Sequence, residues 1–210
     1  MRLADARVAV QGFGNVGSFL AKFLAEEGST VIAISDSSTG LHNPKGIDVA
    51  AALAHKQETG SLAGLRGADE ISNEELLLLE CDVLAPCALE QVITSENAAQ
   101  VKAQIVCEGA NGPVTPTADE ILDDKGVLVL PDILANAGGV VVSYFEWVQG
   151  LQEYFWKEPE VNSKLRDIVT RAFNETWRLY EERQTSMRSA AYGVAVGRVA
   201  EATVTRGLYP

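Results

Sequence analysis

Three glycines close to the N-terminus have the spacing of a phosphate-binding turn, in the string Gly12-Phe13-Gly14-Asn15-Val16-Gly17. In such a turn the first glycine permits a tight bend, the second lets the backbone approach a pyrophosphate, and the third lets a helix pack closely on a sheet. The free N–H groups at the start of that helix bind phosphate. An apolar run precedes the glycines, and apolar residues three and four apart follow them. The string therefore predicts a dinucleotide site, with a plain strand–turn–helix unit as the alternative.

An acidic residue follows at the distance expected for a ribose contact. Asp36, with Ser37 beside it, lies about twenty residues after Gly17 and just beyond the apolar run 30–34. A carboxylate at this place accepts hydrogen bonds from the adenosine ribose and repels a 2′-phosphate, and the nearest cation that follows is Lys45. The sequence therefore favours NAD over NADP. The alternative interpretation of Asp36 is an acidic residue in a solvated turn.

Three later loops carry small and polar residues where apolar runs end: residues 85–88, which include Ala88, then 108–113 and 131–139. In an open α/β sheet, ligands bind outside the carboxyl ends of the strands, so these loops should converge on the cofactor. Asn111 and Asn136 carry amides that both donate and accept hydrogen bonds, as a nicotinamide carboxamide and a ribose require. Taken singly, each asparagine has an ordinary alternative, an Asn-Gly turn for the first and a helix cap for the second.

The elements that would position these residues alternate along the chain. Short apolar runs at 8–10, 30–34, 82–85, 104–107 and 127–130 are typical of parallel strands buried on both faces. Helices are predicted after Gly17 and at 46–60, 95–101 and 116–123, and Ser72 with Glu75 forms a capping-box start for another. Ile47, Ala50, Ala51 and Ala54 share one face of the helix at 46–60.

This order predicts a doubly wound, Rossmann-type, mostly parallel α/β sheet with C-terminal helices. We expect residues 1–150 to form the dinucleotide-binding domain and 151–210 a helical extension packed on it, with long helices at 160–184 and 187–206. The residues that recur at helical spacing from 144 to 155 favour a core or interface face over an aromatic ligand site: Tyr144, Trp147, Val148, Leu151 and Phe155.

Composition excludes several functions. With 210 residues, 47% of them hydrophobic, the chain can bury a large core, and its net charge of −12 argues against a nucleic acid or an anionic membrane as partner. We expect a soluble, cytoplasmic protein, because the chain has neither a run of about 18 apolar residues nor a signal peptide. Two histidines and three scattered cysteines give no metal-site pattern, and the cysteines are predicted to be buried small hydrophobes: Cys81, Cys87 and Cys107.

Together with the glycine string, the later motifs closely resemble the glutamate dehydrogenase branch of the Glu/Leu/Phe/Val dehydrogenase family over nearly the entire chain. The most specific pieces are GFGNVG (12–17), SDSSTG (35–40), EGANGPVTP (108–116), PDILANAGGVVVSYFEWVQ (131–149) and MRSAAY (187–192). The resemblance implies that the chain is the C-terminal, NAD(P)-binding part of such an enzyme. That enzyme deaminates L-glutamate oxidatively to 2-oxoglutarate and ammonia, with hydride transfer to the cofactor.

The resemblance also implies roles for individual residues. The backbone of 13–16 would hold the pyrophosphate, Asp36 the adenosine ribose, Asn111 the nicotinamide ribose and Asn136 the nicotinamide carboxamide. Ser143 matches the serine that contacts the side-chain carboxylate of glutamate in this family. Its alternative interpretation is a hydroxyl that caps an early helical turn.

In this family the catalytic lysine and aspartate belong to a separate N-terminal substrate domain, which the sequence leads us to expect to be absent here. The lysines of this chain all lie outside the three later loops. We therefore expect the chain to bind NAD, with NADP or dual use as the alternative, but not to turn over alone. Glutamate or 2-oxoglutarate would bind together with the substrate domain, and the full-length protein would be a homo-oligomer, as hexamers are in the family. A stand-alone NAD-binding or sensing module, and a dehydrogenase domain for another amino acid, remain alternatives.

Overall fold

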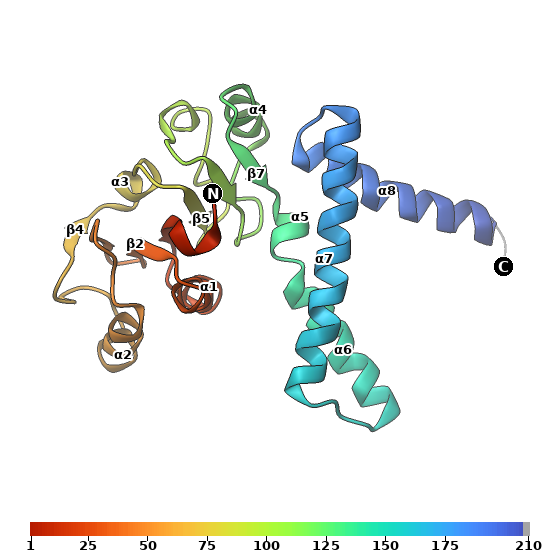
Figure 1. Ribbon diagram of the computed structural model, residues 1–210, viewed down its shortest axis with the longest axis horizontal. Coiled ribbons are helices and arrows are strands. Elements are labelled where there is room, and N and C mark those ends of the chain that lie inside the picture. The colour runs from red at the N-terminus through yellow and green to blue at the C-terminus, as the bar shows by residue number, and fades with distance from the viewer. Residues whose placement is uncertain (208–210) are drawn as a thin grey trace. The chain divides into compact units, whose positions relative to one another are not determined.

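The computed structural model describes residues 1–207 and divides the chain into two compact units, Met1–Val129 and the residues from Leu130 onward. The first unit holds the sheet and the second is helical (Figure 1). The predicted division into 1–150 and 151–210 stays a prediction. Within the described residues, no helix combines the length and the apolar character that crossing a membrane requires.

Seven strands form one sheet in the order β4-β3-β2-β1-β5-β6-β7. Their bounds are β1 Arg7–Gln11, β2 Thr30–Ser35, β3 Gly40–His42, β4 Asp69–Ile71, β5 Val83–Pro86, β6 Ile105–Cys107 and β7 Leu128–Leu130. Strand β1 pairs in parallel with β2 and β5, and β5 pairs in parallel with β6. The prediction of a mostly parallel, doubly wound sheet is confirmed.

Strands β3 and β4 were not expected from the sequence. Both are antiparallel additions at one edge, β3 to β2 and β4 to β3. Each is only three residues long, and β4 exposes Asp69 and Glu70, so neither strand has an apolar run from which it could be predicted. The segment after α2 therefore leads into a strand that is formed by backbone pairing.

The helices of the first unit are α1 Asn15–Glu26, α2 Val49–Thr59, α3 Asn73–Leu77 and α4 Pro116–Asp124, with 3-10 turns η1 Leu3–Asp5 and η2 Ala98–Gln100. The predicted capping box before α3 is present, with Ser72 and Glu75 each bonding to the other's backbone N–H. The helix predicted at 95–101 is wrong, because only η2 forms there. The Asn97 side chain accepts from Thr94 N–H and donates to Val92 O, bonds that replace those of a helical turn.

Alternate residues of the central strand face two separate cores. Val8 and Val10 belong to a cluster with α1 and α2, whereas Ala9 belongs to a cluster with α3, η2 and α4. Figure 1 shows α1 and α2 on one side of the strands and α3 and α4 on the other. The face predicted for α2 is wrong for its alanines, because Ala50, Ala51 and Ala54 are exposed while the buried residues of α2 are Val49 and Ala52. Ile47, which precedes α2, is half-buried and packs against the cluster of Val8 and Val10.

The second unit consists of α5 Asp132–Ala135, α6 Gly138–Gln152, α7 Glu158–Arg183 and α8 Met187–Arg206. The long helix α7 contacts α5, α6 and α8. Arg188 of α8 lies 3.5 Å from the Asp132 carboxylate of α5, and Met187 is buried. The long helices predicted from residues 160 and 187 are confirmed.

The aromatic face predicted on α6 is exposed in the described residues. Tyr144 and Trp147 have ring centroids 5.8 Å apart, yet their exposed fractions are 57% and 60%. Leu151, and Phe155 beyond the end of α6, are exposed as well, whereas Val148 is half-buried. This face is therefore not part of a core of the described residues, and its role as an interface stays a prediction.

Candidate dinucleotide site

The strand order of the sheet reverses within the first unit. From β1 the chain moves to β2 on one side, and it later returns to β5 on the other side of β1. In open α/β sheets, ligands bind at the carboxyl ends of the strands where the order reverses in this way. The reversal here lies between β1 and β5, and the loops that follow these strands carry the predicted site residues.

The glycine turn after β1 has the geometry that its sequence predicts. Gly12 has φ +95°, a left-handed conformation that glycine adopts without strain. A Cβ added to Gly17 would stand 1.8 Å from the Gly12 carbonyl oxygen, so α1 and the turn are packed without room for a side chain. A Cβ added to Gly14 would have no neighbour within 4 Å in the described residues. Of the three glycines in this turn, only Gly14 therefore has open space beside it, at the start of α1.

Gly14 is the N-cap of α1, and within the described part of the chain its cap lacks a side-chain hydrogen bond. Asn15 and Val16, the first residues of α1, are exposed. The N–H groups of a first helical turn have no partner inside the helix, and the helix dipole adds partial positive charge there. This end of α1 can therefore bind a phosphate.

The loops after β1, β5 and β6 touch one another. A Cβ on Gly12 would lie 2.7 Å from Ala88 Cβ, and a Cβ on Gly109 would lie 2.5 Å from Cys87 Sγ and 3.4 Å from Val16 Cγ1. Cys87 N–H also donates to the Gln11 carbonyl at 2.7 Å. The convergence predicted for the loops at 85–88 and 108–113 is thus present within the first unit.

A hydrogen-bond network below the turn fixes it to the end of β2. The buried Ser35 hydroxyl accepts from Gly12 N–H at 3.1 Å and donates to Asn73 Oδ1 at 2.6 Å. The Asn73 amide in turn donates to the Asp36 carbonyl at 3.2 Å. Ser35 and Asn73 thus position the glycine turn and Asp36 together. Sequence reasoning found neither, because their role depends on contacts between separate strands and a helix.

The Asp36 side chain is only 6% exposed and is held by backbone donors. Its Oδ1 accepts from the N–H groups of Ser38 at 2.8 Å and Thr39 at 3.1 Å, and its Oδ2 accepts from Leu62 N–H at 2.8 Å. Burial alone would raise the pKa of this carboxyl group. The three N–H bonds, together with the charge of Lys56, outweigh burial and hold the pKa of Asp36 below its ordinary value. The group is therefore an ionised, largely enclosed carboxylate.

Lys56 is the charged residue of this region that sequence reasoning missed. Its Nζ lies 3.4 Å from Asp36 Oδ2 and donates to the Phe13 carbonyl at 3.0 Å. Lys45, named from the sequence as the nearest cation, is exposed in the turn before α2. The signal that could have revealed Lys56 is its position on α2, on the face that buries Val49 and Ala52.

The three cysteines are neutral, packed thiols. Burial raises the pKa of Cys87 to about 12, with a contribution from neighbouring Cys107, and raises the pKa of Cys107 and of Cys81 to about 11. Cys81 is buried and the other two are half-buried. A thiol reacts through its thiolate, so these groups act as packed apolar side chains rather than as nucleophiles.

The remaining predicted residues are divided between the two units. Ser37 and Asn111 lie in exposed turns of the first unit, after β2 and β6. Asn136 ends the short helix α5 and is half-buried, and Ser143 is exposed on α6, both in the second unit. Asn136 does occupy a C-cap position, whereas Ser143 lies beyond the first turn of α6. The ligand contacts assigned to these residues stay predictions.

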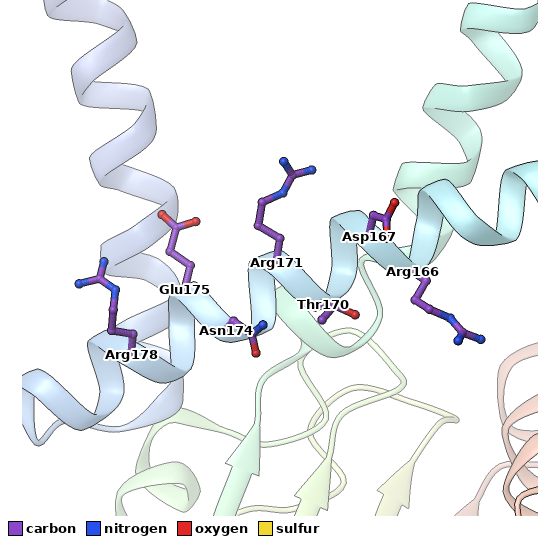
Figure 2. A pocket seen from close by; sticks show the side chains of 7 residues that line it. All are labelled: Arg166, Asp167, Thr170, Arg171, Asn174, Glu175 and Arg178. Atoms are coloured by element: carbon purple, nitrogen blue, oxygen red, sulfur yellow. The ribbon is translucent and has the colours of Figure 1, made fainter.

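A hollow lies on α7, and its chemistry is unlike that of the candidate dinucleotide site. Figure 2 shows Arg166 and Arg171 pointing to different sides of this helix, with acidic side chains between the arginines. Arg178 pairs with Glu182 at 2.9 Å, and Glu175 pairs with Arg198 of α8. The charges have both signs and several are already paired, as on an ordinary solvated helix face.

The reversal of strand order, the glycine turn and the converging loops define a Rossmann-type dinucleotide-binding domain. Comparison with known proteins identifies the family to which this domain belongs. The family model for Glutamate/Leucine/Phenylalanine/Valine dehydrogenase matches residues 1–207, and the chain belongs to this family.

Similar proteins are glutamate dehydrogenases by name. The chain is 52% identical to the glutamate dehydrogenase of Thermotoga maritima, over 98% of this chain and 50% of that one. It is 52% identical to an NADP-specific glutamate dehydrogenase of Halobacterium salinarum and 48% identical to an NAD-specific one of Staphylococcus aureus, in each case over 99% of this chain and 50% of the relative. The chain therefore spans about half the length of these relatives.

Solved structures agree with this assignment. The hetero-hexameric glutamate dehydrogenase of Thermus thermophilus, in a leucine-bound form, matches with a TM-score of 0.92 at 39% identity, over 100% of this chain and 50% of that one. The glutamate dehydrogenase of Peptoniphilus asaccharolyticus matches with a TM-score of 0.84 at 36% identity, over 100% and 49%. The fold is that of the nucleotide-binding half of these enzymes.

Proposed function

We propose that this chain binds a nicotinamide dinucleotide as the cofactor half of a glutamate dehydrogenase, an enzyme that deaminates L-glutamate oxidatively to 2-oxoglutarate and ammonia. The observation that carries the proposal is the contact among the loops after β1, β5 and β6 at the point where the strand order reverses. The names of the relatives support glutamate as the substrate.

The residues present fit a dinucleotide. Gly14 leaves open space at the start of α1, where N–H groups can bind the pyrophosphate. Gln11, directly before this turn, buries its side-chain Oε1 without a hydrogen-bond partner among the described residues. Buried polar atoms are normally bonded, and an unsatisfied one calls for a water, an ion or a functional role. When bound, the cofactor would accept the hydride, and the protein residues would bind and orient it.

Ser143 is the proposed contact for the side-chain carboxylate of glutamate. Its hydroxyl is exposed on α6 and can donate one hydrogen bond to an anionic oxygen. When turnover is measured with a substrate half supplied, Ser143→Ala should raise the KM for glutamate by about tenfold, the effect of losing one hydrogen bond to a charged group. An unchanged KM would contradict this role.

A fluorescence titration tests the proposed cofactor site. Residues 1–210 should bind NADH saturably, followed by the emission of NADH itself. Gly14→Ala should weaken this binding by about tenfold or more, because the added methyl group occupies space that the pyrophosphate needs. Gly150→Ala is the matched control, since a Cβ there also meets nothing within 4 Å in the described residues but lies on α6. Absence of binding at millimolar NADH would refute the assignment.

The same preparation tests whether residues 1–210 are catalytically active by themselves. We propose that residues 1–210 do not turn over glutamate by themselves, because the chain spans half the length of enzymes with this activity. Glutamate with NAD or NADP should therefore give no NADH or NADPH, and activity in a purified sample would contradict the proposal.

We also propose that the protein acts as a homo-oligomer. The exposed face of α6, with Tyr144 and Trp147, supports an interface, and the Thermus relative is described as hetero-hexameric. Light scattering on the complete protein should give a mass several times that of one chain, and a monomer would contradict this proposal.

A further inference from the structure

Gln91, in the loop after β5, has an unusual backbone conformation. Its φ is +54°, in the left-handed region that is strained for a residue with a side chain. Among the described residues, the other non-glycine residues with a positive φ are Glu153 and Gln184. Both are C-caps, of α6 and α7, and a left-handed residue commonly ends a helix. Gln91 lies outside every described helix, so its conformation needs a different explanation.

Backbone hydrogen bonds attach the segment around Gln91 to the loop that follows β6. Gln91 N–H donates to the Gly112 carbonyl at 2.8 Å, and Ile93 N–H donates to the Pro113 carbonyl at 2.9 Å. Ile93 and Val114 continue the contact as a parallel bridge. Because Ile93 is fully buried and Val114 is 5% exposed, both sides of this attachment are anchored in the core.

The same loop is also attached at its beginning, to the end of β5. The N–H groups of Gly109 and Ala110 both donate to the Pro86 carbonyl, at 3.0 and 2.9 Å. Asn111 is the residue between this first attachment and the second one at Gly112, and it is exposed. The backbone on both sides of Asn111 is therefore held by the segment that begins with the last residue of β5.

We propose that Gln91 is a positioning residue for the cofactor, because its left-handed backbone holds the Gly112 carbonyl and so places Asn111 for the ribose of the nicotinamide half. Gln91 itself is exposed, and the contact with Gly112 is made by its backbone N–H, so its side-chain amide is not required. Strained backbone persists where the surrounding structure imposes it, and it concentrates at ligand sites. This inference rests on the proposed cofactor function and adds a residue to it.

The test compares NADH, which carries the nicotinamide ribose, with ADP, which lacks it. The affinity of residues 1–210 for NADH is followed by NADH emission, and that for ADP by displacement of NADH. Gln91→Pro removes the N–H group and fixes φ near −65°. It should weaken NADH by about fivefold, the effect of one lost hydrogen bond, and leave ADP within about twofold. Gln91→Gly, which adopts a positive φ without strain, should leave both affinities within about twofold.

A double-mutant cycle distinguishes positioning of Asn111 from a general loss of structure. Asn111→Ala alone should also weaken NADH by about fivefold. Adding Gln91→Pro to Asn111→Ala should then change the NADH affinity by less than about twofold, because both substitutions remove the same contact. A residue with a merely structural role would instead weaken NADH further in the double variant.

Gln184→Pro is the matched control, because Gln184 is the same residue type at φ +50° but ends α7. It should leave both affinities within about twofold. If circular dichroism shows that Gln91→Pro does not fold, Gln91→Val replaces it, since a β-branched residue disfavours this φ and keeps the N–H group. Gln91→Val should weaken NADH by about threefold and leave ADP within about twofold.

An unchanged NADH affinity in the Gln91 variants would refute the inference, and so would equal weakening of NADH and ADP or additive effects with Asn111→Ala. In each of these cases the proposed function stands, because the unaltered chain still binds NADH. If the unaltered chain binds neither NADH nor ADP, the proposed function itself fails.

Discussion

Gly17 is the glycine at which an added side chain would clash most severely with the surrounding structure. Replacing it by alanine would add a Cβ 1.8 Å from the Gly12 carbonyl oxygen, whereas such pairs do not approach within 3.0 Å. The opposing atom belongs to the backbone and cannot rotate away, and Val10 Cγ1 stands 3.1 Å away on another side. The first turn of α1 would therefore have to move by more than about 1 Å relative to the turn that it packs on.

The cost follows from two opposing effects. Forcing an extra methyl group into a packed site costs about 1–3 kcal/mol, and the backbone clash places Gly17→Ala at the upper end of that range. Alanine in a helix regains about 0.5–1 kcal/mol relative to glycine. We therefore expect a net loss of about 2 kcal/mol in the free energy of unfolding, or a fall of about 4–8 °C in Tm for a chain of this length. Urea titration and thermal melting, both followed by far-UV circular dichroism, measure it.

Gly14→Ala provides the comparison within the same turn. Its Cβ meets no atom within 4 Å among residues 1–207, so only the poorer N-cap character of alanine counts, about 0.5–1 kcal/mol. If Gly17→Ala were as stable as Gly14→Ala, the close packing of α1 on the turn would be refuted. A large loss in both variants would equally contradict the reasoning, because the open space at Gly14 would then not exist.

Three further predictions concern the surroundings of the site. Asp36→Asn should lower the free energy of unfolding by about 1–3 kcal/mol at pH 7, because Leu62 N–H loses its charged acceptor. Since the pKa of Asp36 in the folded chain lies below its ordinary value of 3.8, the carboxylate stabilises the fold above that pH. Urea titrations should therefore show that the stability difference between the unaltered chain and the variant shrinks as the pH falls through the lowered pKa. Ser72→Ala should cost about 1 kcal/mol in the same titration, because it removes the capping box of α3, and no loss would show that this cap contributes nothing. The thiols of Cys81, Cys87 and Cys107 should react with a chromogenic disulfide reagent at pH 8 at least about 100-fold more slowly in the folded chain than in the unfolded chain, because burial keeps them neutral. Rapid labelling of the folded chain would contradict the raised pKa values of these thiols.

The parts of the fold that were predicted from the sequence have local signals. Buried parallel strands are continuous apolar runs, and the glycine turn is specified by residues that only its backbone conformation requires, such as Gly12 at φ +95°. The contact of the loop at 85–88 with the turn also follows from topology, because both loops leave neighbouring parallel strands at the same edge. Local pattern and chain order were sufficient for these features.

The parts that escaped prediction depend on pairing between distant segments. Strands β3 and β4 have three residues each and are specified by backbone pairing, β3 with β2 and β4 with β3, rather than by composition. Lys56 is 20 positions from Asp36 in the sequence, and only the packing of α2 brings its ammonium group to 3.4 Å from that carboxylate. The exposed aromatic face of α6 has the periodicity of a buried face, and periodicity alone does not distinguish a core from an interface.

Backbone NMR of residues 1–210 during titration with NADH tests the central claim most directly. We expect the largest amide shift changes at Gly12–Gly17 of the turn, at Cys87 and Ala88 after β5, and at Gly109 and Asn111 after β6, the loops that meet where the strand order reverses. The arginine-bearing face of α7, including Arg171, should remain unchanged. Shifts confined to α7, or no shifts at saturating NADH, would contradict the assignment of these loops as the dinucleotide site.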